Sequence, residues 1–153
     1  MKWGSAVYAD SSAENHAIAV AIRMLGGTPV QVREAREAAW GMAGFGIAYP
    51  AIMGLIIGAD AARAASIQFS LSWILGLVAF GFAGRRYRAD TIAMVLAILQ
   101  AVVCLRAHDD AIPSLLWIAT VLYSMGVCAA IAYLLRRPVA KAWFATGVSR
   151  PMC

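Results

Sequence analysis

The chain has 153 residues, of which 62% are hydrophobic and 14% are charged, with a formal net charge of +5. About a quarter of the residues in a soluble domain are charged, so the composition excludes an ordinary soluble globular protein. The apolar stretches are continuous, whereas the strands of a membrane β-barrel alternate apolar and polar residues. The sequence therefore predicts an all-α polytopic membrane protein, a four-transmembrane-helix bundle with a short N-terminal amphipathic helix.

An amphipathic helix is predicted within the amino segment 1–37, from Ala13 to Leu25. Ile18, Ile22 and Leu25 fall on one face of this helix, and most of its charged residues lie elsewhere. A helix with a single apolar stripe beside a membrane usually lies flat at the interface or packs against a partner. These three residues are therefore the candidates for docking on a partner or on the membrane.

A second helix is predicted to start at Thr28 and to continue without a break into the first span. Thr28 would cap this helix, Pro29 suits its first position, and Gln31 would complete a capping box. The first span is thus expected to be the membrane-embedded part of a longer helix.

Four apolar stretches approach or reach the 20 or so residues that a spanning helix needs. They cover residues 38–59, 66–83, 91–105 and 112–135, joined by loops over 60–65, 84–90 and 106–111. Loops this short make successive helices antiparallel neighbours. Residues 136–153 are predicted to form a basic tail, in which Pro138 ends the last helix.

The basic residues are distributed unevenly about these spans. The amino segment holds four Lys or Arg, the second loop three and the tail four, whereas the opposite side holds only Arg63 and Arg106. By the positive-inside rule this imbalance places both termini in the cytoplasm, and a bacterial inner membrane is the expected location. The basic face is also expected to attract anionic lipid headgroups. Nucleic acid is not an expected partner, because the cations lie close to the membrane and form no separate basic domain.

Small residues at four-residue spacing predict close contacts between helices. The candidates for this packing are Gly54 and Gly58 in the first span, Ala93, Ala97 and Ala101 in the third, and Ser124 and Cys128 in the fourth. A four-helix protein needs some such faces internally. Because small residues occur on three spans and the remaining faces are apolar, the expected partners are other membrane subunits or copies of the same chain.

Several uncharged polar residues enter the spans, among them Tyr49, Gln68, Gln100 and Thr120. In the predicted orientation most of them lie between the midplane and the outer face. They would form either a shallow polar pocket that opens outward, or hydrogen bonds between helices worth about 0.6 kcal/mol each. We favour the second interpretation.

No catalytic, cofactor or metal site is predicted. The motifs GxSxG, HExxH and CxxC are absent, and His16 and His108 are predicted on opposite sides of the membrane. Proton-coupled transporters usually place an ionisable residue inside a span, and here the middle of each span has none. The leading hypothesis is a non-enzymatic subunit or scaffold of a larger membrane assembly, such as a secretion, respiratory or transport complex. The alternative is a small homo-oligomeric channel or transporter with an outward-facing polar pocket.

Overall fold

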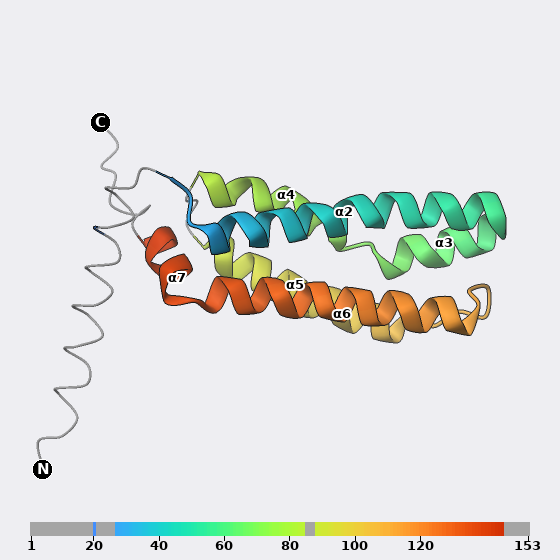
Figure 1. Cartoon of the computed structure of the whole chain (residues 1–153). Helices are drawn as coiled ribbons and strands as arrows, with labels where there is room; N and C mark the ends of the chain where they lie inside the picture. The colour runs from blue at the N-terminus through green and yellow to red at the C-terminus, as the bar shows by residue number, and fades with distance from the viewer. Residues whose placement is uncertain (1–19, 21–26, 85–87, 146–153) are drawn as a thin grey trace, which may run out of the picture.

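The computed structural model describes residue 20 and residues 27–84 and 88–145. All regular elements among these residues are helices, namely α2 (Val30–Ile56), α3 (Ala59–Gln68), α4 (Ser72–Ala83), α5 (Ala89–Arg106), α6 (Ser114–Arg136) and α7 (Pro138–Ala145). Helices α2 to α6 form one elongated bundle, and α7 packs at the end where α2 begins (Figure 1). The all-α fold is thus confirmed for this part of the chain. The predicted amphipathic helix with Ile18, Ile22 and Leu25 lies outside the described residues.

Three helices, α2, α5 and α6, are each long and apolar enough to cross a membrane. Helices α3 and α4 meet the same criterion only when they are taken together, across a bend of 42°. The third and fourth predicted spans correspond closely to α5 and α6, whereas the second is interrupted at residues 69–71. The structure supports a membrane protein on the strength of these three helices, and a fourth span belongs to the proposal below.

The prediction of a loop over residues 60–65 is wrong, because these residues lie inside α3. Five of the first seven residues of α3 are alanine, the strongest helix former. Asp60 lies in the first turn, where a negative charge interacts favourably with the helix dipole. The chain reverses just before this helix, at Gly58, whose φ of 134° suits a residue without a Cβ.

The predicted capping box at the start of the first long helix is also wrong. Pro29 is the N-cap residue of α2, and no side chain caps this end. A capping box needs Thr28 at the N-cap with Gln31 three residues later, but the helix begins one residue too late for that arrangement. The predicted continuity is confirmed as far as Ile56, because α2 passes through Pro50 without interruption.

Pro50 leaves one carbonyl of α2 without its helical partner. Proline has no backbone N–H, so the carbonyl of Gly46, four residues earlier, loses its usual donor. The indole N–H of Trp73 in α4 donates to this oxygen over 3.4 Å. A neighbouring helix therefore supplies the missing donor, as is usual for proline in spanning helices.

Helix α6 ends at Arg136, just before Pro138, as predicted, but Pro138 also begins a further helix, α7, within the predicted tail. Proline is favoured in the first turn of a helix, where its missing N–H costs nothing. Trp143 and Phe144 of α7 are buried, and the indole N–H of Trp143 donates to the carbonyl of Phe82 over 3.0 Å. These two residues of the predicted basic tail thus pack against the end of α4.

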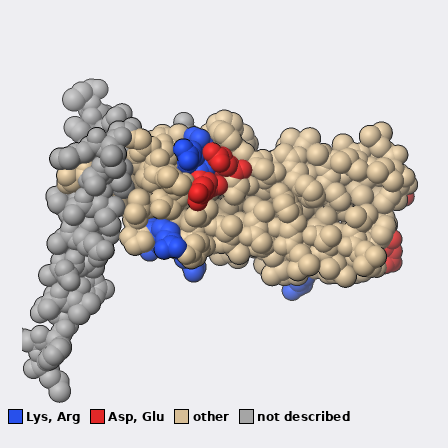
Figure 2. Space-filling model, viewed as in Figure 1, with Lys and Arg blue, Asp and Glu red and all other residues tan. Residues whose placement is uncertain are grey.

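The outer surface of the bundle is strongly apolar. Leu55 is 88% exposed, Leu115 is 83% exposed and Leu77 is 69% exposed. Figure 2 shows an extended uncharged surface over much of the bundle, with acidic and basic side chains gathered toward the end where α2 begins, acidic side chains at the opposite end and a basic side chain on the lower edge between them. An apolar surface of this extent is suited to lipid or to another protein and not to water.

Candidate functional site

The break between α3 and α4 exposes a backbone carbonyl inside the bundle. In a continuous helix the N–H of Ser72 would donate to the carbonyl of Gln68. It donates instead to the carbonyl of Phe69 over 3.1 Å, and the Ser72 hydroxyl donates to the same oxygen over 2.6 Å. The carbonyl of Gln68 therefore needs a donor from elsewhere in the protein.

Helix α5 supplies two donors to this carbonyl. The amide nitrogen of Gln100 donates to the Gln68 carbonyl oxygen over 2.8 Å, and the thiol of Cys104 reaches the same oxygen at 3.2 Å. Gln100 and Cys104 are four residues apart, so both side chains project from the same face of α5. The amide nitrogen of Gln100 also lies 3.1 Å from the sulfur of Cys104.

Helix α6 completes this cluster. The side-chain amide of Gln68 donates to the hydroxyl of Thr120 over 2.9 Å, and Thr120 donates to the carbonyl of Trp117. Ser124, one turn further along α6, is fully buried beside them, near the thiol of Cys104. We call Gln68, Gln100, Cys104, Thr120 and Ser124 the polar layer.

Four buried polar atoms in or beside the polar layer make no regular hydrogen bond among the described residues. They are the side-chain oxygens of Gln68 and Gln100, the hydroxyl of Ser124 and the hydroxyl of Tyr49. Tyr49 lies beside Thr120, and both residues line an apolar groove of about 440 Å³ between α2 and α6. An unpaired buried acceptor or hydroxyl costs about 1–3 kcal/mol, so these atoms mark where a water or a polar ligand group would bind favourably.

The chemistry of the polar layer is that of amides, hydroxyls and thiols. Such groups donate and accept hydrogen bonds but do not readily transfer protons or activate nucleophiles without a neighbouring base. Among the described residues no three His, Cys, Asp or Glu side chains are placed to bind a metal ion together. The polar layer is therefore suited to holding helices together or to binding an uncharged polar group.

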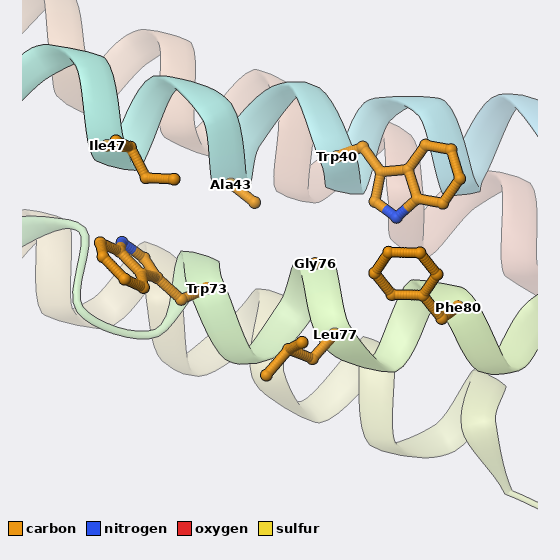
Figure 3. Close-up of a pocket in the computed structure, with 7 residues that line it drawn as sticks. All are labelled: Trp40, Ala43, Ile47, Trp73, Gly76, Leu77 and Phe80. Atoms are coloured by element: carbon orange, nitrogen blue, oxygen red, sulfur yellow. The ribbon is translucent and has the colours of Figure 1, made fainter.

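Two further hollows lie away from the polar layer. An apolar groove of about 350 Å³ runs between α2 and α4 and is lined by Trp40, Ala43, Ile47, Trp73, Gly76, Leu77 and Phe80 (Figure 3). A more polar hollow of about 500 Å³ lies at the end of the bundle opposite α7, where Asp60 and Arg63 of α3 face Asp109 of the α5–α6 loop.

The small residues predicted to mediate helix packing occupy different environments. Gly54 faces α3, and a Cβ at this position would lie 3.1 Å from the Cβ of Ala62. Gly58 lies beyond the end of α2, so Gly54 and Gly58 do not form one helical packing face. The remaining predicted packing residues point inward, with Ala93, Ala97, Ser124 and Cys128 buried and Ala101 half-buried.

A second set of small residues on α2, not recognised as a face from the sequence, points outward. Gly41, Gly44, Ala48 and Ala51 are all exposed, and nothing lies within 4 Å of a Cβ built on either glycine. Their spacing of three, four and three residues places them on one stripe of the helix. We call these four residues the outer stripe. The spacing itself is visible in the sequence, but only the structure shows that this face is not used inside the bundle.

No family model, curated protein or solved structure matches the chain in comparisons with known proteins. The polar layer, the grooves and the outer stripe are therefore the features of the molecule that bear on its function.

Proposed function

We propose that the chain is a non-enzymatic subunit or scaffold of a larger membrane assembly and that α2 is the helix that contacts its partner. The observation that supports this most strongly is the outer stripe. Small residues let two helix backbones approach closely in a membrane, where van der Waals packing stabilises helix association. The helices that the structure describes leave this face exposed, so a helix of another subunit or of a second copy could pack against it.

The proposal includes four membrane spans, with α3 and α4 together forming the second. In Figure 1 the pair follows the length of α2, with α3 beside its second half and α4 beside its first half. The pair extends from Ala59 to Ala83 and contains about 33 Å of helix, against about 30 Å for a hydrocarbon core. A pair that follows one spanning helix for most of its length is expected to span the same membrane.

The polar layer supports a structural role for its residues in this proposal. The side-chain amide nitrogens of Gln68 and Gln100 both donate to partners inside the bundle. Gln100 and Cys104 satisfy the carbonyl that the break between α3 and α4 leaves free, as lipid surroundings require. A layer that closes the break in this way stabilises the bundle without any transported substrate.

The proposal is tested with Gly44→Leu. This position is open, so the protein itself should fold normally, but a leucine side chain would hold a partner helix away. After purification in mild detergent, the variant should lose proteins that co-purify with the wild type, or lose its own oligomer. Ala129→Leu, at an exposed small residue of α6, is the matched control and should retain them. Unchanged association in Gly44→Leu would contradict the proposed role of the outer stripe.

The alternative function is a small homo-oligomeric channel or transporter. The observation that favours it is the group of buried polar oxygens without regular partners in and beside the polar layer. This alternative predicts flux through liposomes that contain only the purified protein, and an altered flux when Gln68 and Gln100 are both replaced by leucine. Our leading proposal predicts no flux in this assay, with or without the two substitutions.

A further inference from the structure

The groove between α2 and α4 has small residues at its centre and aromatic residues toward both ends. Ala43 and Gly76 face each other across the middle, and a Cβ on Gly76 would lie only 2.6 Å from that of Ala43 (Figure 3). Trp40 packs against Phe80 at one end, with ring centroids 5.1 Å apart, and Trp73 lies toward the other end. The result is a slot whose lining is almost entirely apolar.

A cationic side chain lies at the Trp40 end of this slot. The guanidinium carbon of Arg36 is 4.9 Å from the centre of the Trp40 ring. The Nε of Arg36 is buried and makes no hydrogen bond among the described residues. Arg36 is also in register with the α2 side of the slot, because residues 36, 40, 43 and 47 follow one helical stripe.

The acidic residues nearest to Arg36 are not placed to neutralise its positive charge. Glu37 lies 3.9 Å from the Nε of Arg33, so its nearest ion pair is with that residue. Glu34 projects from the opposite side of α2, about 160° around the helix from Arg36. At this end of the bundle the described residues include six Lys or Arg but only three Asp or Glu.

The length of the slot is close to half the thickness of the hydrocarbon core of a bilayer. From Arg36 to Ile47 the helix rises about 16 Å, close to half of a hydrocarbon core of about 30 Å. A partner helix that crosses the membrane would extend far beyond this slot, whereas an acyl chain of one leaflet would not. Tryptophan is common at the level of lipid headgroups, and Trp40 is one turn from the cationic end.

We propose that the groove between α2 and α4 binds one acyl chain of an anionic phospholipid, with its phosphate held by Arg36. The lipid belongs to the leaflet at the end of the bundle where α2 begins. Its chain lies between the aromatic pair of Trp40 and Phe80 and the indole of Trp73, and its phosphate accepts charge-assisted hydrogen bonds from the guanidinium. This inference depends on the membrane location of α2 and not on the proposed partner, so either can fail without the other.

The test uses the purified full chain in phosphatidylcholine vesicles and measures quenching of tryptophan fluorescence by bromine atoms on acyl chains. Brominated phosphatidylglycerol should quench more strongly than brominated phosphatidylcholine at the same mole fraction. A W40F/W73F variant should lose this excess quenching, because these two tryptophans line the groove. Equal quenching of the wild type by the two lipids would overturn the proposal.

Charge variants then test the headgroup contact. Arg36→Gln should weaken the apparent affinity for brominated phosphatidylglycerol about tenfold, as expected for the loss of one charge-assisted hydrogen bond. Arg36→Lys should recover part of this affinity, because the charge remains. Arg136→Gln is the matched control, since it removes one exposed charge at the same end of the bundle but outside the groove. If Arg36→Gln and Arg136→Gln have the same apparent affinity for brominated phosphatidylglycerol, the proposal is wrong. It is also wrong if a stable dimer shields the groove from both lipids.

Discussion

The carbonyl oxygen of Gln68 receives donors from two side chains, and this redundancy has a measurable effect. Gln100 donates to it over 2.8 Å and Cys104 over 3.2 Å. If one donor is removed, the other remains within reach. If both are removed, a backbone acceptor is left unpaired inside the bundle, which costs about 1–3 kcal/mol.

A double-mutant cycle tests this redundancy. Gln100→Leu and Cys104→Ala should each destabilise the protein modestly, whereas the double variant should lose more than the sum of the two by about 1 kcal/mol. The measurement is the free energy of unfolding in mixed detergent micelles. Additive losses would show that the two donors do not share one acceptor. Ile98→Leu, on the exposed face of α5, controls for general effects of substitution in this helix.

Two glycines of α2 that are two residues apart should respond differently to alanine. A Cβ at Gly46 would overlap the hydroxyl oxygen of Ser72, so Gly46→Ala should destabilise the protein by about 1–3 kcal/mol. Gly44 has open space around it, and Gly44→Ala should be neutral or stabilising by up to about 1 kcal/mol, because alanine is the better helix former. Thermal unfolding of both variants in the same detergent makes the comparison. Similar stabilities for the two would contradict the close crossing of α2 and α4.

The sequence identified the polar residues individually but did not reveal why they meet. Gln68, Gln100 and Thr120 stand out as polar positions within apolar stretches, and the structure places them in one hydrogen-bonded layer. The break at residues 69–71 brings them together, and this segment has neither Gly nor Pro to indicate a break. Cys104 lies within an apolar stretch and gives no sign of this role in the sequence, because the role depends on a carbonyl that only a broken helix exposes.

At the scale of elements, hydropathy located α5 and α6 well and located the ends of other helices poorly. Asp60 and Arg63 indicated a loop, yet the alanines around them form a helix whose charges face the polar end of the bundle. Pro138 correctly indicated the end of α6, but proline also suits the start of a helix, and α7 begins there. The missed helices α3 and α7 have one cause, because a charge or a proline can mark a boundary without showing which of the flanking residues are helical.

The proposed second span predicts that the two ends of the α3–α4 pair lie on opposite faces of the membrane. In a background with Cys153 replaced by serine, single cysteines are introduced at Arg63 and at Ala83. A membrane-impermeant maleimide added to intact cells should label one of them and spare the other. If both introduced cysteines are labelled in intact cells, the pair enters and leaves the membrane on the same face. The same conclusion follows if neither is labelled until the cells are opened. Cys104 and Cys128 are buried and should not react in either case.

For the whole molecule, the orientation remains a prediction from the distribution of basic residues. Fusion of a reporter that is active only in the periplasm should give a signal at Arg63 and none at Cys153, because eleven basic residues against two favour cytoplasmic termini. A signal from the Cys153 fusion alone would reverse this orientation. Replacing Arg136 and Arg137 by glutamine serves as a control, since the remaining basic residues should preserve the topology.

The break between α3 and α4 also has a consequence for how the protein is made. The ribosome completes Gln68 well before it reaches Gln100 and Cys104, 32 and 36 residues further along the chain. Until those residues are made, the growing chain lacks the two side chains that donate to the carbonyl of Gln68 in the bundle, and α3 meets the criterion for a membrane span only together with α4. We therefore expect the first half of the protein to remain beside the insertion machinery, or in contact with water, until α5 arrives. Final insertion of this region is expected to occur late in synthesis and together with the third spanning segment.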